Sequence, residues 1–145
     1  MKLTAVAVEK MGINDFIGKK IDCECGHEHY MKVDKVIIEN GAINKLVNIV
    51  NEYNSKHPLI IADTHTYEVA GKKVEELFDK NNIEYKTLVY QVERDLVPDE
   101  QAMGKLIIAV DNSTDFLIAV GSGVLNDLTK YISRRTGIKG MIVAT

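Results

Sequence analysis

The sequence has little of several features that would otherwise set its class. It has two cysteines, two prolines and no tryptophan among its 145 residues. Two cysteines separated by one residue are not the framework of a disulfide-stabilised secreted domain, so we expect a reducing, cytoplasmic environment. No apolar run approaches the roughly 18 residues of a membrane-spanning helix, and the N-terminus lacks the apolar stretch of a signal peptide. We therefore expect a globular protein with no membrane span.

The sequence also lacks an excess of basic charge. Lysine and arginine number 18 and aspartate and glutamate 21, which gives a net charge of −3. Proteins that bind the phosphate backbone of nucleic acid normally carry a basic patch, so nucleic acid is disfavoured as a partner. Hydrophobic residues make up 46% of the chain. A chain of this length can bury roughly two thirds of its unfolded surface, and we expect one domain over residues 1–145.

Short apolar runs alternate with amphipathic segments along the chain. Runs rich in β-branched residues predict strands at 36–38, 59–62, 88–90, 116–120 and 141–144. Several are continuously apolar, which is typical of strands that are covered on both faces. Strands that alternate with helices form βαβ units. We therefore predict an α/β fold: a Rossmann-like, mainly parallel sheet with helices on both faces.

Four segments have apolar residues at the three- and four-residue spacing of a helix. Their predicted buried stripes are Ala42, Leu46, Ile49, Val50 and Tyr53; Val69, Ala70, Val74, Leu77 and Phe78; Met103, Leu106, Ile107 and Val110; and Val124, Leu125, Leu128, Tyr131 and Ile132. Asp63 and Thr64 are candidate caps for the second helix, and the third is expected over 99–110. Gly137 can take the left-handed conformation that ends the fourth.

The first part of the chain carries a cluster of possible metal ligands. Residues 21–33 predict a hairpin that turns near Gly26 and forms an antiparallel edge of the sheet. Cys23, Cys25, His27 and His29 lie within this hairpin. Thiols and imidazoles bind zinc, but alternate residues of an extended strand are about 6.6 Å apart, too far for ligands of one ion. A turn at Gly26 could fold the pairs together, yet we favour a hairpin with buried thiols.

The most informative motif is a glycine turn between a predicted strand and a predicted helix. It reads Gly121-Ser122-Gly123 and is followed by Val124 and Leu125. Glycine lets the backbone approach a ligand closely, and a helix N-terminus offers free N–H groups and partial positive charge. A diphosphate suits such a turn. The alternative is that the glycines only allow a tight turn, and the motif is not the usual G-x-G-x-x-G fingerprint.

A second candidate lies at the end of an earlier strand. Asp63 follows the apolar run 59–62. An acidic residue there can accept hydrogen bonds from the ribose of NAD. The alternative, favoured for this residue taken alone, is that Asp63 only caps the next helix. We expect His65, in the same loop, to be solvated.

Three segments together resemble a known family. They are residues 63–71, residues 120–130 and the terminal Val143-Ala144-Thr145. They are similar to the sn-glycerol-1-phosphate dehydrogenases of the dehydroquinate synthase-like and iron-containing alcohol dehydrogenase superfamily. The Cys-x-Cys-Gly segment is similar to the bacterial branch of this family.

The resemblance implies an NAD or NADP cofactor. It implies that Gly121, Ser122, Gly123, Val124 and Leu125 line the diphosphate of the dinucleotide. It also implies that Asp63 lies beside the adenosine ribose and that Thr145 begins a Thr-x-x-Ser segment at the nucleotide.

The resemblance further implies reversible hydride transfer between the cofactor and dihydroxyacetone phosphate, giving sn-glycerol 1-phosphate for phospholipid biosynthesis. The family's divalent metal (zinc, nickel or iron) is held by an aspartate and two histidines of a helical domain. The resemblance places all three after Thr145. We therefore assign neither a catalytic residue nor a metal ligand here, and transfer none to His27, His29, His57 or His65. On this interpretation the 145 residues are an inactive cofactor domain.

Two alternatives stay open for the function. A glycerol dehydrogenase or another member of the superfamily would have the same cofactor motif, because substrate choice lies elsewhere. A stand-alone nucleotide-binding module would have the motif without catalysis. Self-association is plausible as well, because apolar surface that another domain would cover favours association.

Overall fold

The chain forms two compact units in the computed structural model, residues Met1–Ala42 and Ile43–Thr145. The structure describes residues 2–3, 11–23, 25–121 and 123–145, and the side chains of residues 2, 3 and 21–23 are not described. Within the described residues, no helix is long and apolar enough to cross a membrane.

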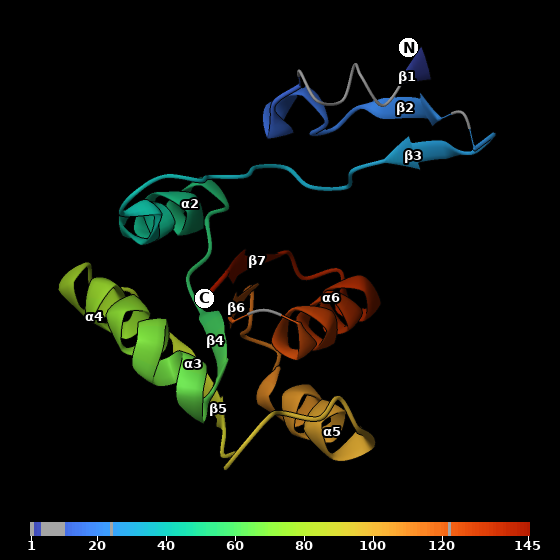
Figure 1. Ribbon diagram of the computed structural model, residues 1–145. Coiled ribbons are helices and arrows are strands. Elements are labelled where there is room, and N and C mark those ends of the chain that lie inside the picture. The colour runs from blue at the N-terminus through green and yellow to red at the C-terminus, as the bar shows by residue number, and fades with distance from the viewer. Residues whose placement is uncertain (1, 4–10, 24, 122) are drawn as a thin grey trace. The chain divides into compact units, whose positions relative to one another are not determined.

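The larger unit is built on a four-stranded parallel sheet (Figure 1). Its strands are β4 (Pro58–Asp63), β5 (Lys86–Tyr90), β6 (Phe116–Val120) and β7 (Gly140–Val143). They lie in the order β5-β4-β6-β7, and every neighbouring pair is parallel. The two central strands, β4 and β6, are almost wholly buried. The predicted parallel α/β sheet and its last four strands are therefore confirmed.

Helices cover both faces of this sheet. The segments are η2 (Ala42–Lys45), α2 (Leu46–Glu52), α3 (Thr64–Thr66), η3 (Tyr67–Gly71), α4 (Lys72–Lys80), α5 (Glu100–Ala109) and α6 (Val124–Thr136). Asp99 caps α5 by accepting a hydrogen bond from the Ala102 N–H at 2.8 Å. Gly137 ends α6 in the left-handed conformation at φ 77°. Both helix ends lie where the sequence predicts them.

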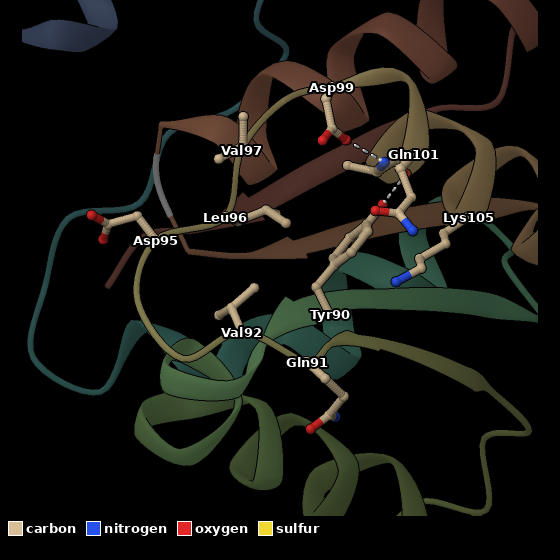
Figure 2. A pocket seen from close by; sticks show the side chains of 10 residues that line it. Tyr90, Gln91, Val92, Asp95, Leu96, Val97, Asp99, Gln101 and Lys105 are labelled. Carbon is tan, nitrogen blue, oxygen red and sulfur yellow. Dashed lines mark hydrogen bonds between the residues drawn. The ribbon is translucent and has the colours of Figure 1, made fainter.

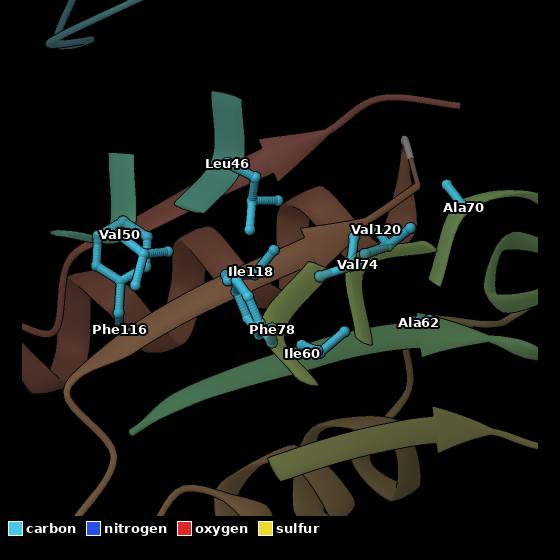
Figure 3. Close-up of a cluster of buried hydrophobic side chains, with 10 residues drawn as sticks. All are labelled: Leu46, Val50, Ile60, Ala62, Ala70, Val74, Phe78, Phe116, Ile118 and Val120. Atoms are coloured by element: carbon cyan, nitrogen blue, oxygen red, sulfur yellow. The ribbon is translucent and has the colours of Figure 1, made fainter. Parts of the chain in front are cut away.

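Side chains that alternate between the two faces of β4 divide the core into two clusters. Ile60 and Ala62 point to one face, toward α2 and α4, whereas Leu59 and Ile61 point to the other. Figure 3 shows the first cluster, where Val74 and Phe78 of α4 pack against Ile60. Leu106 of α5 and Leu128 of α6 belong to the second cluster.

Three predicted core residues lie outside the core. Val69 is 73% exposed, Ile107 54% and Tyr131 52%. Val69 lies in η3, which is a π-helix, and its wider turn shifts the residues before α4 away from the 3.6-residue stripe. Ile107 comes directly after Leu106, and Tyr131 comes directly before Ile132. Leu106 and Ile132 are the residues of these helices that face the sheet. A neighbour on a helix is rotated by about 100° from the buried direction.

The smaller unit holds a separate three-stranded sheet. Its elements are β1 (Lys2–Leu3), η1 (Ile13–Asp15), β2 (Lys20–Cys23) and β3 (Glu28–Tyr30), with strand order β1-β2-β3. The predicted hairpin is confirmed, because β2 and β3 pair antiparallel. The prediction that it forms an edge of the parallel sheet is wrong. All three residues of β3 are exposed, so this strand has no apolar face that would pack in the main core.

Two further predictions for this unit are wrong. Residues 36–38 form no strand, and Ile38 is 81% exposed, since a three-residue run between charged residues is too short to be buried on two faces. The thiol of Cys25 is exposed rather than buried. The side chain of Cys23 lies outside the described residues.

Candidate functional site

The candidate site lies at the carboxyl ends of β4 and β6. These strands are neighbours in the sheet, but the chain leaves β4 for β5 on one side and leaves β6 for β7 on the other. The connections therefore diverge between them. In open parallel sheets, ligands bind in the crevice at such a switch point.

The glycine turn after β6 adopts backbone conformations that favour glycine. Gly121 has φ 141° and Gly123 has φ 50°. The Gly121 N–H donates to the carbonyl oxygen of Val143 at 2.9 Å, which fixes the turn to β7. A Cβ at Gly121 would lie 2.6 Å from Leu125 Cδ1 and 3.1 Å from Thr66 Cγ2. The turn is therefore closely packed, and only glycine fits at its first position, Gly121.

This turn leads directly into α6, whose first N–H groups face the switch point. The N-cap residue is Gly123, which has no side chain to accept hydrogen bonds from the first N–H groups of the helix. In the first turn, the buried Asn126 Oδ1 has no hydrogen-bond partner within the described residues. The N–H donors and the positive end of the helix fit a diphosphate, whereas the Asn126 oxygen is an acceptor and does not contribute to binding an anion. Ser122 lies outside the described residues.

Asp63 is the last residue of β4 and the N-cap of α3. The predicted capping role is therefore confirmed. Its Oδ1 accepts hydrogen bonds from the N–H groups of His65 at 2.9 Å and Thr66 at 2.8 Å. The Asp63 N–H in turn donates to Thr66 Oγ1 at 3.0 Å. Among the described residues, Oδ2 makes no hydrogen bond. The cap therefore uses one oxygen and leaves the other for a ligand.

Other predicted residues lie around this edge. Leu125 is buried in the second core cluster, and Val124 packs against the same cluster. Thr145 is exposed and lies two residues after β7, at the same end of the sheet. His65 is exposed and its Nε2 lies 3.1 Å from the carbonyl oxygen of Arg94.

The sequence reasoning missed a pocket beside the end of β5. It has a volume of about 200 Å³, and its lining includes Tyr90, Leu96, Asp99 and Lys105 (Figure 2). Thr64 ties this pocket to the candidate site, because its hydroxyl donates to the Tyr90 carbonyl and accepts from the Val92 N–H. No pattern in the sequence signals this pocket, because it depends on the pairing of β5 with β4, which places Tyr90 opposite Asp63.

Burial raises the pKa of Tyr90 to about 12. Its hydroxyl donates to the carbonyl oxygen of Ala102 at 2.8 Å. This phenol is therefore neutral at physiological pH and acts as a fixed wall of the pocket.

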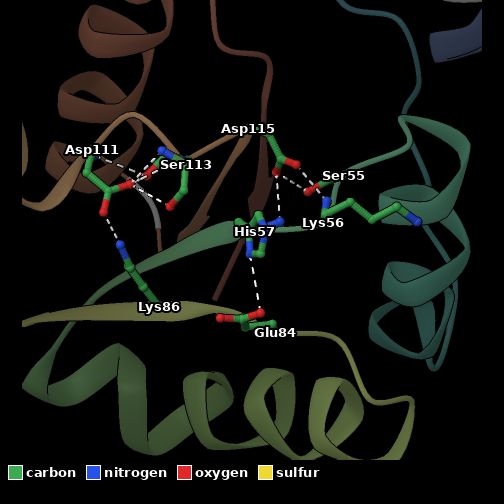
Figure 4. Close-up of polar contacts among 9 residues, drawn as sticks. Ser55, Lys56, His57, Glu84, Lys86, Asp111, Ser113 and Asp115 are labelled. Atoms are coloured by element: carbon green, nitrogen blue, oxygen red, sulfur yellow. Dashed lines mark hydrogen bonds and ion pairs between the residues drawn. The ribbon is translucent and has the colours of Figure 1, made fainter.

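A polar network holds the opposite end of the sheet (Figure 4). Asp115 accepts hydrogen bonds from the Ser55 hydroxyl at 2.6 Å and from the N–H groups of Lys56 and His57. Burial alone would raise the pKa of Asp115, but these hydrogen bonds together hold it below its ordinary value. All three donors belong to residues of the fold itself, so we infer that this network stabilises the fold.

Asp111, in the same loop, makes comparable bonds. The Lys86 ammonium donates to its carboxylate, and the Ser113 N–H and hydroxyl donate as well. The Lys86 bond is the main reason that the pKa of Asp111 is far below its usual range. Asp111 thus organises the turn before β6, because it accepts hydrogen bonds from Ser113 and Thr114.

No metal centre is formed by the described residues, among which no group of three or more histidine, cysteine, aspartate or glutamate side chains gathers.

The fold is that of an α/β domain with a mainly parallel sheet and a glycine turn at its switch point. Comparison with known proteins gives the particular family: residues 37–145 match the iron-containing alcohol dehydrogenases, and the chain belongs to this family.

Curated relatives agree with this assignment. A glycerol-1-phosphate dehydrogenase [NAD(P)+] of Halalkalibacterium halodurans is 35% identical over 119 residues, which are 80% of this chain and 30% of the relative. One from Geobacillus stearothermophilus is 26% identical over 126 residues, 85% of this chain and 31% of the relative. A 3-dehydroquinate synthase of Lactococcus lactis subsp. cremoris is 30% identical over 102 residues, 68% and 29% of the two chains.

The fold has a solved counterpart. The glycerol dehydrogenase of Schizosaccharomyces pombe superposes with a TM-score of 0.56 at 20% identity, over 70% of this chain and 25% of that chain. The chain spans about 30% of the length of the curated relatives that it matches.

Proposed function

We propose that residues 1–145 are the NAD(P)-binding domain of a metal-dependent dehydrogenase that reduces dihydroxyacetone phosphate to sn-glycerol 1-phosphate. The observation that carries the proposal is the glycine turn of β6 and α6 lying beside the end of β4 at the switch point. The relatives named glycerol-1-phosphate dehydrogenase support the reaction.

In this proposal the dinucleotide lies along the carboxyl edge of the sheet. The diphosphate is bound by Gly121, Ser122, Gly123, Val124 and Leu125, where the free N–H groups of α6 face outward. Asp63 Oδ2 accepts hydrogen bonds from the adenosine ribose. The adenine enters the pocket at Tyr90, because β5 is the next strand beyond β4. Thr145 contacts the nicotinamide side.

When bound, the cofactor would supply the hydride, and a divalent metal would polarise the carbonyl oxygen of the substrate. The described residues gather no metal-binding group. In the proposal their task is therefore to bind and orient the cofactor. Reduction of dihydroxyacetone phosphate by NADH, catalysed by the 145-residue chain alone, would contradict this division of roles.

Calorimetric titration of the 145-residue chain with NAD, NADP and ADP-ribose tests the cofactor site. We expect NAD and ADP-ribose to bind through the diphosphate that they share, and NADP to bind more weakly, because its 2′-phosphate would face the Asp63 carboxylate. Adenosine, which lacks the diphosphate, serves as the matched ligand control and should bind much more weakly. Absence of binding by both NAD and ADP-ribose would overturn the site.

A second candidate is another member of the superfamily. The 3-dehydroquinate synthase relatives and the glycerol dehydrogenase fold match favour it. Steady-state assays of the full-length protein separate the candidates, because dihydroxyacetone phosphate, glycerol and a dehydroquinate precursor are different substrates. A stand-alone nucleotide-binding module would bind NAD and turn over none of them.

A further inference from the structure

Thr64 joins the Asp63 cap to the pocket beside β5. Its hydroxyl donates to the carbonyl oxygen of Tyr90 at 3.2 Å and accepts from the N–H of Val92 at 3.1 Å. Tyr90 is the last residue of β5, Val92 lies in the loop over residues 91–98, and both line the pocket (Figure 2). One side chain therefore holds the backbone on either side of Gln91, where this loop begins.

A second bond from the same turn reaches this loop. His65 Nε2 lies 3.1 Å from the carbonyl oxygen of Arg94. A carbonyl oxygen only accepts hydrogen bonds, so the ring nitrogen is the donor. Water competes with this exposed bond, and the half-buried hydroxyl of Thr64 is therefore the stronger of the two connections.

The rest of the pocket wall is held from other elements. The Tyr90 hydroxyl donates to the carbonyl oxygen of Ala102 in α5 at 2.8 Å. Val92 and Leu96 pack against the second core cluster. These contacts fix the pocket against α5 and the core. Its position relative to the end of β4 then depends on Thr64.

The proposed ribose acceptor lies directly beside this connection. Asp63 and Tyr90 are register partners on β4 and β5, and neighbouring strands are about 4.8 Å apart. Asp63 Oδ1 accepts the N–H groups of His65 and Thr66, which fixes the orientation of the carboxylate. Oδ2 and the pocket are therefore held at one separation. A ligand can use both only when its base and its ribose belong to the same nucleoside.

We propose that Thr64, assisted by His65, is a positioning residue that makes this edge of the sheet specific for the adenosine end of a dinucleotide. The inference rests on the proposed function, because it takes the pocket at Tyr90 as the adenine subsite and Asp63 as the ribose acceptor. The single hydrogen of the Thr64 hydroxyl is used on the Tyr90 carbonyl, so Thr64 acts through the loop. The diphosphate has separate donors at the start of α6.

Thr64→Val tests the proposal, because valine keeps the branched shape of threonine and removes the hydroxyl. Calorimetric titration of the 145-residue chain with NAD, ADP-ribose and inorganic pyrophosphate measures the effect. We expect NAD and ADP-ribose to bind about three- to tenfold more weakly, as for the loss of a neutral hydrogen bond. The affinity for pyrophosphate, which has no adenosine, should be unchanged. Thr64→Ser keeps the hydroxyl and should bind NAD as the unaltered chain does.

Thr136→Val is the matched control. The Thr136 hydroxyl donates to the carbonyl oxygen of Ile132 at 2.8 Å and accepts from the N–H of Ile138 at 3.2 Å. It thus makes the same kinds of bond as Thr64, but at the end of α6 that lies away from the glycine turn. Urea unfolding should show similar losses of stability in the two valine variants, whereas Thr136→Val should bind NAD normally.

His65→Phe is a second variant, in which an exposed ring loses its N–H donor. It should weaken NAD and ADP-ribose in the same direction and to a smaller extent, and it replaces Thr64→Val if that variant does not fold. Normal NAD affinity in the folded variant would overturn this inference alone. Equal weakening of pyrophosphate, or of NAD in Thr136→Val, would also overturn it, because the effect would then be one of general stability. Absence of NAD and ADP-ribose binding by the unaltered chain would overturn the proposed function and this inference with it.

Discussion

Gly121 at the end of β6 lies against Thr66 at the end of α3, so that a Cβ on the glycine would be 3.1 Å from Thr66 Cγ2. Thr66 also accepts the Asp63 N–H and donates its own N–H to Asp63 Oδ1. The glycine turn and the Asp63 cap are therefore parts of one packed edge. Two segments almost 60 residues apart in the sequence, 63–66 and 121–125, are joined there.

Gly121→Ala should disrupt this edge. The added methyl group would meet Leu125 Cδ1 at 2.6 Å, at a backbone φ of 141° that alanine rarely adopts. We expect a loss of about 1–3 kcal/mol in the free energy of unfolding, measured with urea, and weaker NAD binding.

Gly104→Ala is its matched control. Nothing lies within 4 Å of a Cβ at Gly104, which is inside α5. Alanine there should stabilise the helix by up to about 1 kcal/mol. Equal destabilisation by both variants would argue against the packing of Gly121.

Substitutions at Asp63 separate its two roles. Asp63→Ser keeps a capping oxygen but removes the carboxylate, and Asp63→Ala removes both. We expect each to weaken NAD binding about tenfold, since a hydrogen bond to a charged group contributes about 1.5–3 kcal/mol. Only the alanine variant should also lose about 1 kcal/mol of stability. Calorimetry measures NAD affinity, and urea unfolding measures stability. Unchanged NAD affinity in both variants would show that Asp63 only caps the helix.

Asp115 should make stability depend on acid pH. Its pKa is lower in the folded protein than the ordinary 3.8. A carboxyl group with a lowered folded pKa stabilises the protein fully above its unfolded pKa, and this contribution is lost as pH falls through the folded pKa. Asp115→Asn should therefore be destabilised at pH 7, and its deficit relative to the unaltered chain should shrink below about pH 4.

Urea unfolding at pH 7 and pH 3 measures this difference. A deficit that is equal at both pH values would show that the Asp115 carboxylate contributes through its shape rather than its charge. His57→Gln controls for the nearby imidazole, whose Nδ1 lies 3.7 Å from Glu84.

A pair of α5 variants tests which side of this helix faces the sheet. Leu106 is fully buried and Ile108 is 84% exposed. Leu106→Ala should cost about 2–5 kcal/mol, through lost burial and the cavity that remains. Ile108→Ala should change stability by less than about 0.5 kcal/mol, because surface substitutions rarely do more. A large loss in Ile108→Ala would mean that this face is covered in solution.

Much of the fold could be predicted because its patterns are local. The apolar runs at 59–62 and 116–120 identify buried central strands, and Asp99 and Gly137 mark helix ends. The π-helix at Tyr67–Gly71 could not be predicted, since its hydrogen bonding depends on how Gly71 packs against Tyr67. The exposed thiol of Cys25 was missed for a similar reason. Its surroundings are set by the turn and not by its hydrophobicity.

By itself, the sequence determined the α/β class, the helix caps and the glycine turn, because each depends on neighbouring residues and on backbone conformation. Only the tertiary structure decided the strand order β5-β4-β6-β7 and the separate sheet of the hairpin. It also decided the contact of Gly121 with Thr66 and that of Cys25 with His29. These arrangements arise from the pairing and turning of strands, which short-range patterns do not specify.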